Sequence, residues 1–77
     1  MVKEAGLVAK AMSLLDILAR EGGCSITRLA QQAGLPVATA HRIVRTLIER
    51  DYILRVARAR YTLGPAMLRL GAAISIR

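Results

Sequence analysis

The sequence predicts a small, mainly α-helical domain that carries one short β-hairpin. Apolar residues recur at spacings of three and four through most of the chain, which is the period of an amphipathic helix. After residue 50 the pattern changes to two short runs that are rich in β-forming residues. The 77 residues are enough for one domain of this kind.

Composition limits which residues can form the core, in which compartment the protein is expected and which kind of partner it binds. Hydrophobic residues make up 55% of the chain and its only aromatic residues are two tyrosines, so the core must be aliphatic. The single cysteine, Cys24, excludes an internal disulfide and a cysteine-cluster zinc site, and we expect it in a turn in a reducing compartment. Because the sequence shows no signal peptide and no apolar run of membrane-spanning length, we expect a cytoplasmic protein without a membrane partner. The net charge of +7 favours an anionic partner, with nucleic acid ahead of a membrane surface or incidental basicity.

The first helix is predicted over residues 6–21 and has two apolar stripes. One stripe comprises Val8, Ala11, Met12, Leu15, Leu18 and Ala19, and the other comprises Leu7, Leu14 and Ile17. This arc is wider than one packing face needs. Either a few apolar side chains stay exposed, or a second subunit covers them.

Two further helices follow after Gly22 and Gly23. One is predicted over Thr27–Ala33, with Ser25 or Thr27 as its N-cap. The other is predicted over Pro36–Arg50, since proline is favourable at the first helical position. Its polar face is basic, and its apolar stripe comprises Ala40, Ile43, Val44, Leu47 and Ile48.

The hairpin is predicted from strands at Tyr52–Val56 and Arg60–Leu63. The connection, Ala57–Ala59, lacks the Gly, Asn or Asp that a tight hairpin turn favours. Gly64 and Pro65 then break the chain, and a fourth helix is predicted over residues 66–76. The apolar face of this helix comprises Met67, Leu70 and Ile74.

The second and third helices carry the pattern of a helix-turn-helix. Ala30 and Ala40 are small enough to let two helices cross closely, and Gly34 permits the positive φ that a tight turn needs. Leu35 and Ile43 are expected to fill the space between the helices. With a basic third helix and a hairpin directly after it, the pattern predicts a winged helix-turn-helix: three helices, a two-stranded wing and a C-terminal linker helix.

The same residues resemble a known family. The run from Leu29 to Arg42, the later Arg60-Tyr61-Thr62-Leu63-Gly64 and the opening helix through Ala11 and Leu15 resemble the IclR-type transcriptional regulators. The resemblance implies a regulator, most often a repressor, that binds a double-stranded DNA operator as a homodimer, with the third helix in the major groove. It also implies that residues 1–64 form the DNA-binding domain. Residues 65–77 would then begin the linker helix that leads to a small-molecule effector domain. Since that domain is absent from this sequence, the resemblance implies a fragment or a truncated protein.

Two departures from the family change the expected contacts. The family often has Lys and Ser where this chain has Val37 and Ala38, so one cation and one hydroxyl near DNA are missing. The family's wing tip usually contains acidic residues and glycine, whereas this one contains Arg58 and Arg60. A more basic wing should hold phosphate or the minor groove more strongly.

The third helix supplies the main candidates for DNA contacts. Arg42 is the first candidate for base reading, because a guanidinium pairs with two guanine acceptors; the alternative is a salt bridge with Glu49 or Glu21. Thr39 either touches a phosphate or a thymine methyl, or caps the helix start. His41, which is the only histidine, either hydrogen-bonds locally or contacts a phosphate.

Other candidates lie on the second helix and the wing. Arg28 is placed to grip phosphate, or is a solvated surface cation. At least one of Arg55, Arg58 and Arg60 is expected to reach DNA. Residues 37–62 hold six arginines against two acidic residues, so +4 of the total +7 lies in this third of the chain. The predicted DNA contacts are Ser25, Thr27, Arg28, Val37, Ala38, Thr39, His41, Arg42, Arg45, Arg58 and Arg60.

Other function classes fit less well. A winged-helix module that binds protein should have a neutral or apolar third helix, and a membrane-surface peptide should have its basic residues on one lone helix. The sequence shows no catalytic set, so we expect no enzyme, no cofactor and no metal. If two copies associate, the expected interface comprises Leu7, Leu14, Ile17, Met67, Leu70 and Ile74; alternatively, this chain is monomeric alone.

Overall fold

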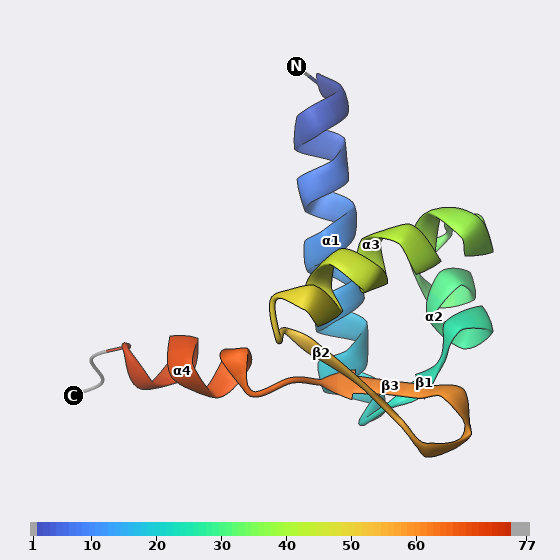
Figure 1. The fold of residues 1–77 in the computed structure, drawn as a ribbon. Helices are drawn as coiled ribbons and strands as arrows, with labels where there is room; N and C mark the ends of the chain where they lie inside the picture. The colour runs from blue at the N-terminus through green and yellow to red at the C-terminus, as the bar shows by residue number, and fades with distance from the viewer. Residues whose placement is uncertain (1, 75–77) are drawn as a thin grey trace.

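The computed structural model describes residues 2–74 and has the predicted order of helices and hairpin (Figure 1). Its elements are α1 (Val2–Glu21), β1 (Cys24–Ser25), α2 (Ile26–Ala33), α3 (Val37–Glu49), β2 (Ile53–Val56), a short 3₁₀ turn (Ala57–Ala59), β3 (Arg60–Leu63) and α4 (Ala66–Ala72). The helix predicted over residues 66–76 therefore ends at Ala72, and residues 75–76 lie outside the described residues.

The sheet has three antiparallel strands in the order β1-β3-β2, one strand more than predicted. The hairpin pairs Ile53 with Leu63 and Val56 with Arg60. On the other side of β3, Cys24 pairs with Tyr61. The prediction that Cys24 lies in a turn is therefore wrong. A two-residue strand is too short to show an alternating pattern in sequence.

The turn between α2 and α3 is built as predicted. Gly34 caps α2 in the left-handed region at φ 68°, and its N–H points to the carbonyl oxygens of Ala30 and Gln31. The next amide, that of Leu35, donates to the Ala30 oxygen at 3.0 Å. Ala30 and Ala40 are both buried, which lets the helices approach closely. The α3 helix begins at Val37 rather than at Pro36, which has an extended ψ of 143° and forms the N-cap.

The core packs one face of α1 against α2, α3 and the sheet. Its buried members are Leu14, Ile17, Leu18, Cys24, Leu29, Ile43, Val44, Ile53 and Tyr61. Leu14 is 0% exposed and Ile17 is 4% exposed, so the prediction that they face a second subunit is wrong. The other α1 stripe is only partly buried: Leu18 is 1% exposed, whereas Val8 and Met12 are exposed.

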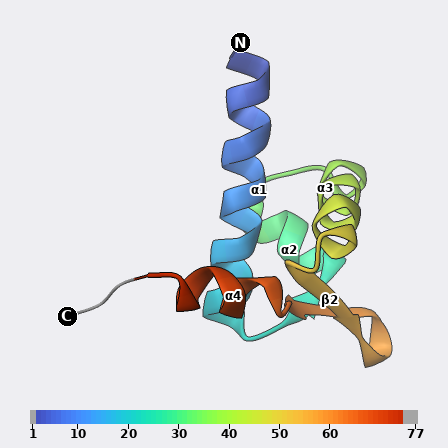
Figure 2. The same cartoon turned by 60° about the vertical axis from the view of Figure 1, so that its left-hand side comes forward.

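Two helices project from this body. The N-terminal end of α1 extends beyond the other elements, and α4 leads away from the sheet on the side opposite the hairpin tip (Figure 1). In the turned view, α3 and the hairpin lie on the same side of α1 (Figure 2). The fold therefore presents the third helix and the wing together on one side of the molecule.

Candidate nucleic-acid interface

The outer face of α3 is exposed and basic. His41, Arg42 and Arg45 are exposed, while Ile43 and Val44, which lie between them in the sequence, are buried. The predicted division of this helix into a core face and a polar face is confirmed. Because the helix is anchored by its apolar face, its cationic side chains are held on the side away from the core.

The start of α3 presents backbone as well as side chains. Val37 is 46% exposed, and Ala38 is exposed beside it. The N-cap is Pro36, with no side-chain hydrogen bond to the helix, so Thr39, which is half-buried, does not cap it. First-turn amides of a helix have no intrahelical partner, and they carry the positive end of the helix dipole. Short apolar side chains leave these amides accessible to an anion.

Arg42 does not form the salt bridge with Glu49 or Glu21 that was the alternative to its reading a base. Among the side chains described in residues 6–74, the ion pair present joins Arg28 Nη2 to Glu21 Oε2 at 3.3 Å. Glu21 is thus engaged by another arginine, and Glu49 forms no salt bridge in the described part of the chain. The Arg42 guanidinium is consequently available on the α3 surface.

The start of α2 is organised by Ser25. Its Oγ accepts a hydrogen bond from the backbone N–H of Arg28 at 3.2 Å, which identifies it as the N-cap. Thr27 and Arg28 are exposed beside it. The Arg28 side chain is 51% exposed despite its pairing with Glu21, and an exposed pair contributes only about 0–1 kcal/mol. Arg28 can therefore exchange Glu21 for another anion at small cost.

The arginines of the wing differ in their surroundings. Arg55 lies opposite Tyr61 in the ladder. Arg58 lies at the tip, in the left-handed region at φ 64°. The Nη2 of Arg60 donates a hydrogen bond to the carbonyl oxygen of Gly23 at 2.7 Å. The Gly23 contact joins residues 37 positions apart, so no local sequence pattern indicated it.

The thiol of Cys24 lies buried in β1, against the core. Burial raises the pKa of its thiol, and the Glu21 carboxylate adds to this, while Arg60 and Arg28 oppose it. A thiol held protonated is a weak nucleophile and a weak metal ligand. In the described residues, no three His, Cys, Asp or Glu side chains gather as a metal site would need. No helix within residues 2–74 is long and apolar enough to cross a membrane.

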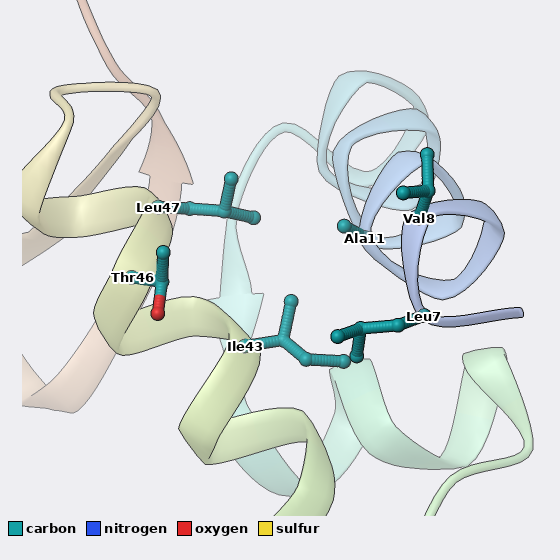
Figure 3. A pocket seen from close by; sticks show the side chains of 6 residues that line it. All are labelled: Leu7, Val8, Ala11, Ile43, Thr46 and Leu47. Atoms are coloured by element: carbon teal, nitrogen blue, oxygen red, sulfur yellow. The ribbon is translucent and has the colours of Figure 1, made fainter. Parts of the chain in front are cut away.

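Apolar surface lies along α1, where this helix faces α3 and α4. A groove of about 210 Å³ runs between α1 and α3, where Leu7 and Ile43 point toward one another (Figure 3). A second apolar groove, of about 240 Å³, lies between α1 and α4 and is lined by Met12, Met67 and Leu70 among others. Ile74 is exposed beyond it. Of the predicted interface residues, Leu7, Met67, Leu70 and Ile74 therefore remain at or near the surface.

A close helix pair with a glycine turn, followed by a three-stranded sheet with a projecting hairpin, defines a winged helix-turn-helix domain. The IclR helix-turn-helix domain family matches residues 7–57. The chain is 30% identical over 70 residues to the HTH-type transcriptional regulator KipR of Bacillus subtilis, covering 91% of this chain and 28% of that protein. It is 36% identical over 50 residues to the transcriptional repressor IclR of Escherichia coli, covering 64% of this chain and 18% of that protein.

Solved structures agree with this assignment. An IclR transcriptional regulator from Alicyclobacillus acidocaldarius superposes with a TM-score of 0.82 at 33% identity, covering 87% of this chain and 28% of that one. HmgR from Pseudomonas aeruginosa superposes with a TM-score of 0.75 at 31% identity, covering 82% and 27%. The chain belongs to the IclR family of transcriptional regulators and contains the helix-turn-helix domain of that family. It spans less than a third of the length of these relatives.

Proposed function

We propose that this chain is the part of a transcriptional regulator that binds its operator in double-stranded DNA. In this proposal α3 lies in the major groove, and the wing lies on the flanking backbone or minor groove. Two observations carry the proposal: the cationic residues His41, Arg42 and Arg45 of α3 are exposed, and α3 lies on the same side of α1 as the arginine-bearing hairpin (Figure 2). Phosphate neutralisation by such a surface supplies affinity, and side chains on the inserted helix supply sequence selectivity.

The roles of the α3 residues follow from their positions. Arg42 reads a guanine, because its guanidinium is exposed and free of acidic partners in the described chain. His41 and Arg45 lie beside it and contact phosphates or bases. Thr39 is half-buried and reaches DNA only through its outer edge, as a phosphate or thymine-methyl contact. Val37 and Ala38 let phosphate approach the first-turn amides of the helix.

The second helix and the wing bind the DNA backbone on either side of the major groove that α3 occupies. Ser25 and Thr27 lie at the exposed start of α2, and Arg28 exchanges its exposed pairing with Glu21 for a phosphate. Arg60 serves mainly to place the wing, since one of its nitrogens is held by Gly23. All these roles are binding roles, so we expect no catalysis by this chain. The operator of a bacterial regulator lies in the cytoplasm, and so does this chain.

We also propose that the operator is bound by two copies of the chain. The exposed apolar residues of α1 (Leu7, Val8 and Met12) and those near α4 (Leu68, Leu70 and Ile74) supply a surface that one copy leaves uncovered. Two-fold symmetry would place two α3 helices in successive major grooves, about 34–36 Å apart. In the longer proteins of this family α4 would begin the connection to an effector-binding domain, through which a small molecule would act.

The proposal is tested by fluorescence anisotropy with a labelled pool of random duplexes over a series of salt concentrations. We expect binding whose affinity falls steeply with salt, since each DNA phosphate that the chain neutralises contributes about −0.9 to the slope of log K against log salt concentration. An Arg42→Ala, Arg45→Ala variant should bind much more weakly. A matched Arg20→Ala, Arg69→Ala variant, which loses the same charge from α1 and α4, should bind almost as the parent does.

Two results contradict the proposal. One is the absence of binding at the lowest salt concentration by a chain that circular dichroism shows to be folded. The other is an equal loss of affinity in both double variants. That result would show that the affinity depends on the net charge of the chain and not on the cationic residues of α3.

A further inference from the structure

The tip of the wing has an unusual backbone for its sequence. Both Arg58 (φ 64°) and Ala59 (φ 55°) occupy the left-handed region. Glycine, asparagine and aspartate adopt this region readily, whereas other residues are disfavoured there by roughly 1–2 kcal/mol each. Strained backbone of this kind is commonly retained where it places a functional side chain. In this hairpin it places Arg58 at the apex.

The chemistry of the tip is that of a single cation among short apolar side chains. The neighbours of Arg58 are Ala57 and Ala59, with Val56 before them, and residues 53–63 contain no acidic side chain. The minor groove of DNA is only about 6 Å wide, so a narrow tip with methyl side chains is suited to approach it. A guanidinium is more weakly hydrated than an ammonium group, so it loses less hydration free energy when it enters a confined site.

The other wing arginines are less suited to this position. Arg60 has its Nη2 engaged by the Gly23 oxygen at 2.7 Å, and Arg55 lies back from the tip, opposite the buried Tyr61. Arg58 forms neither a hydrogen bond nor an ion pair within the described part of the chain. Arg58 is therefore the wing arginine that lies at the tip and has no hydrogen-bond or ion-pair partner among the described residues.

We propose that Arg58 enters the minor groove beside the segment read by α3 and makes the chain prefer operators with A·T-rich flanks. This inference rests on the proposed function, because α3 must occupy the major groove for the wing to meet the flank. A·T tracts narrow the minor groove and deepen its negative potential, which attracts an inserted arginine. The preference arises from groove shape, at base pairs whose major-groove edges the protein does not touch.

The first test is selection of duplexes from a random pool by the parent chain, by Arg58→Ala and by Arg58→Lys. We expect all three to enrich the same central motif, and the parent to enrich A·T pairs on its flanks. The flank enrichment should vanish in Arg58→Ala and be reduced in Arg58→Lys, which keeps the charge. Identical flanks for the parent and Arg58→Ala would overturn the proposal. A parent that enriches no sequence at all would overturn the proposed function and this inference with it.

The second test changes only the minor groove. In a duplex selected by the parent, 2,6-diaminopurine replaces the flanking adenines; it adds an amino group in the minor groove and keeps the major-groove edge of adenine. We expect the parent's Kd to rise about tenfold, a size typical of one mismatched position, and that of Arg58→Ala to stay unchanged. An equal rise for both proteins would overturn the inference. So would an Arg58→Ala variant that loses affinity equally for all flanks, because that pattern indicates a phosphate contact.

Discussion

Arg60 on β3 donates a 2.7 Å hydrogen bond to the backbone oxygen of Gly23, in the turn that follows α1. The bond runs alongside the pairing of β1 with β3, in which Ser25 is the partner of Arg60. The wing is therefore fixed to the end of α1 by a side chain as well as by the ladder. This attachment sets the direction in which the hairpin leaves the body of the domain.

We expect Arg60→Ala to lower the free energy of unfolding by about 1 kcal/mol, which is less than a fully buried hydrogen bond from a charged donor contributes, because the residue is partly exposed. For a chain of this size that corresponds to a fall in Tm of about 4–8 °C. Arg55→Ala is the matched control, since Arg55 has no side-chain hydrogen bond among the described residues. Equal Tm values for the two variants would show that the bond contributes nothing.

A second prediction concerns Gly64, which follows β3. A Cβ at this position would overlap the backbone of Asp51 and Tyr52, and the closest approach would be to the Asp51 oxygen. The Gly64 amide also donates to the Tyr52 oxygen at 2.7 Å, so the two segments have little freedom to separate. We expect Gly64→Ala to destabilise the domain by about 2–3 kcal/mol in urea denaturation. Gly71→Ala, in α4 with open space around it, should be neutral or slightly stabilising.

Periodicity was sufficient to predict the helices of this fold but not which face of α1 is buried. Both apolar stripes of α1 satisfy the helical period, and the core uses Leu14 and Ile17 from the stripe that was expected to face a partner. The choice depends on where α2, α3 and the sheet lie, and a single-sequence pattern does not contain that information. The strand β1 was missed for a similar reason, because its pairing partner Tyr61 lies far along the chain.

The candidate site was predicted more completely on α3 than on the wing. The outward position of Arg42 and Arg45 follows directly from the apolar stripe that anchors the helix. The distinction between Arg58 and Arg60 depends on a left-handed turn without glycine and on a long-range bond to Gly23. Neither feature has a local signature, so the sequence predicted both Arg58 and Arg60 as DNA contacts and did not distinguish them.

The buried thiol of Cys24 makes stability depend on pH in the alkaline range. Burial raises its pKa in the folded state, so the folded chain holds this proton more tightly than the unfolded chain does. This contribution is complete below the ordinary thiol pKa and is lost as the pH rises through the folded-state pKa. We expect the unfolding free energy of the parent to fall over this range more steeply than that of Cys24→Ala. At neutral pH the thiol should react with Ellman's reagent far more slowly in the folded chain than in guanidinium chloride.

A fourth prediction separates base reading from charge at Arg42. On a selected operator, Arg42→Ala and Arg42→Lys should both lose about 1–3 kcal/mol of discrimination against a duplex changed at the contacted G·C pair. Arg42→Lys should keep the salt slope of the parent, because the charge remains, whereas Arg42→Ala should lower it by about 1. Replacement of the contacted guanine by 7-deazaguanine, which removes the N7 acceptor, should weaken the parent and leave Arg42→Ala unaffected. A uniform loss across all duplexes would instead identify Arg42 as a phosphate contact.

The last prediction tests the association of two copies through α1. Met12 is 55% exposed and lines the apolar groove beside α4, so a charge there would be desolvated if a second copy covered the groove. We expect Met12→Asp to raise the dimer dissociation constant by at least about tenfold in sedimentation equilibrium, a size typical of residues in the centre of an interface. Ala19→Asp adds the same charge at another exposed α1 position and should leave association unchanged. Because both positions are exposed, both variants should fold. A parent that stays monomeric at every concentration, or a Met12→Asp variant as dimeric as the parent, would show that the α1 surface serves another purpose.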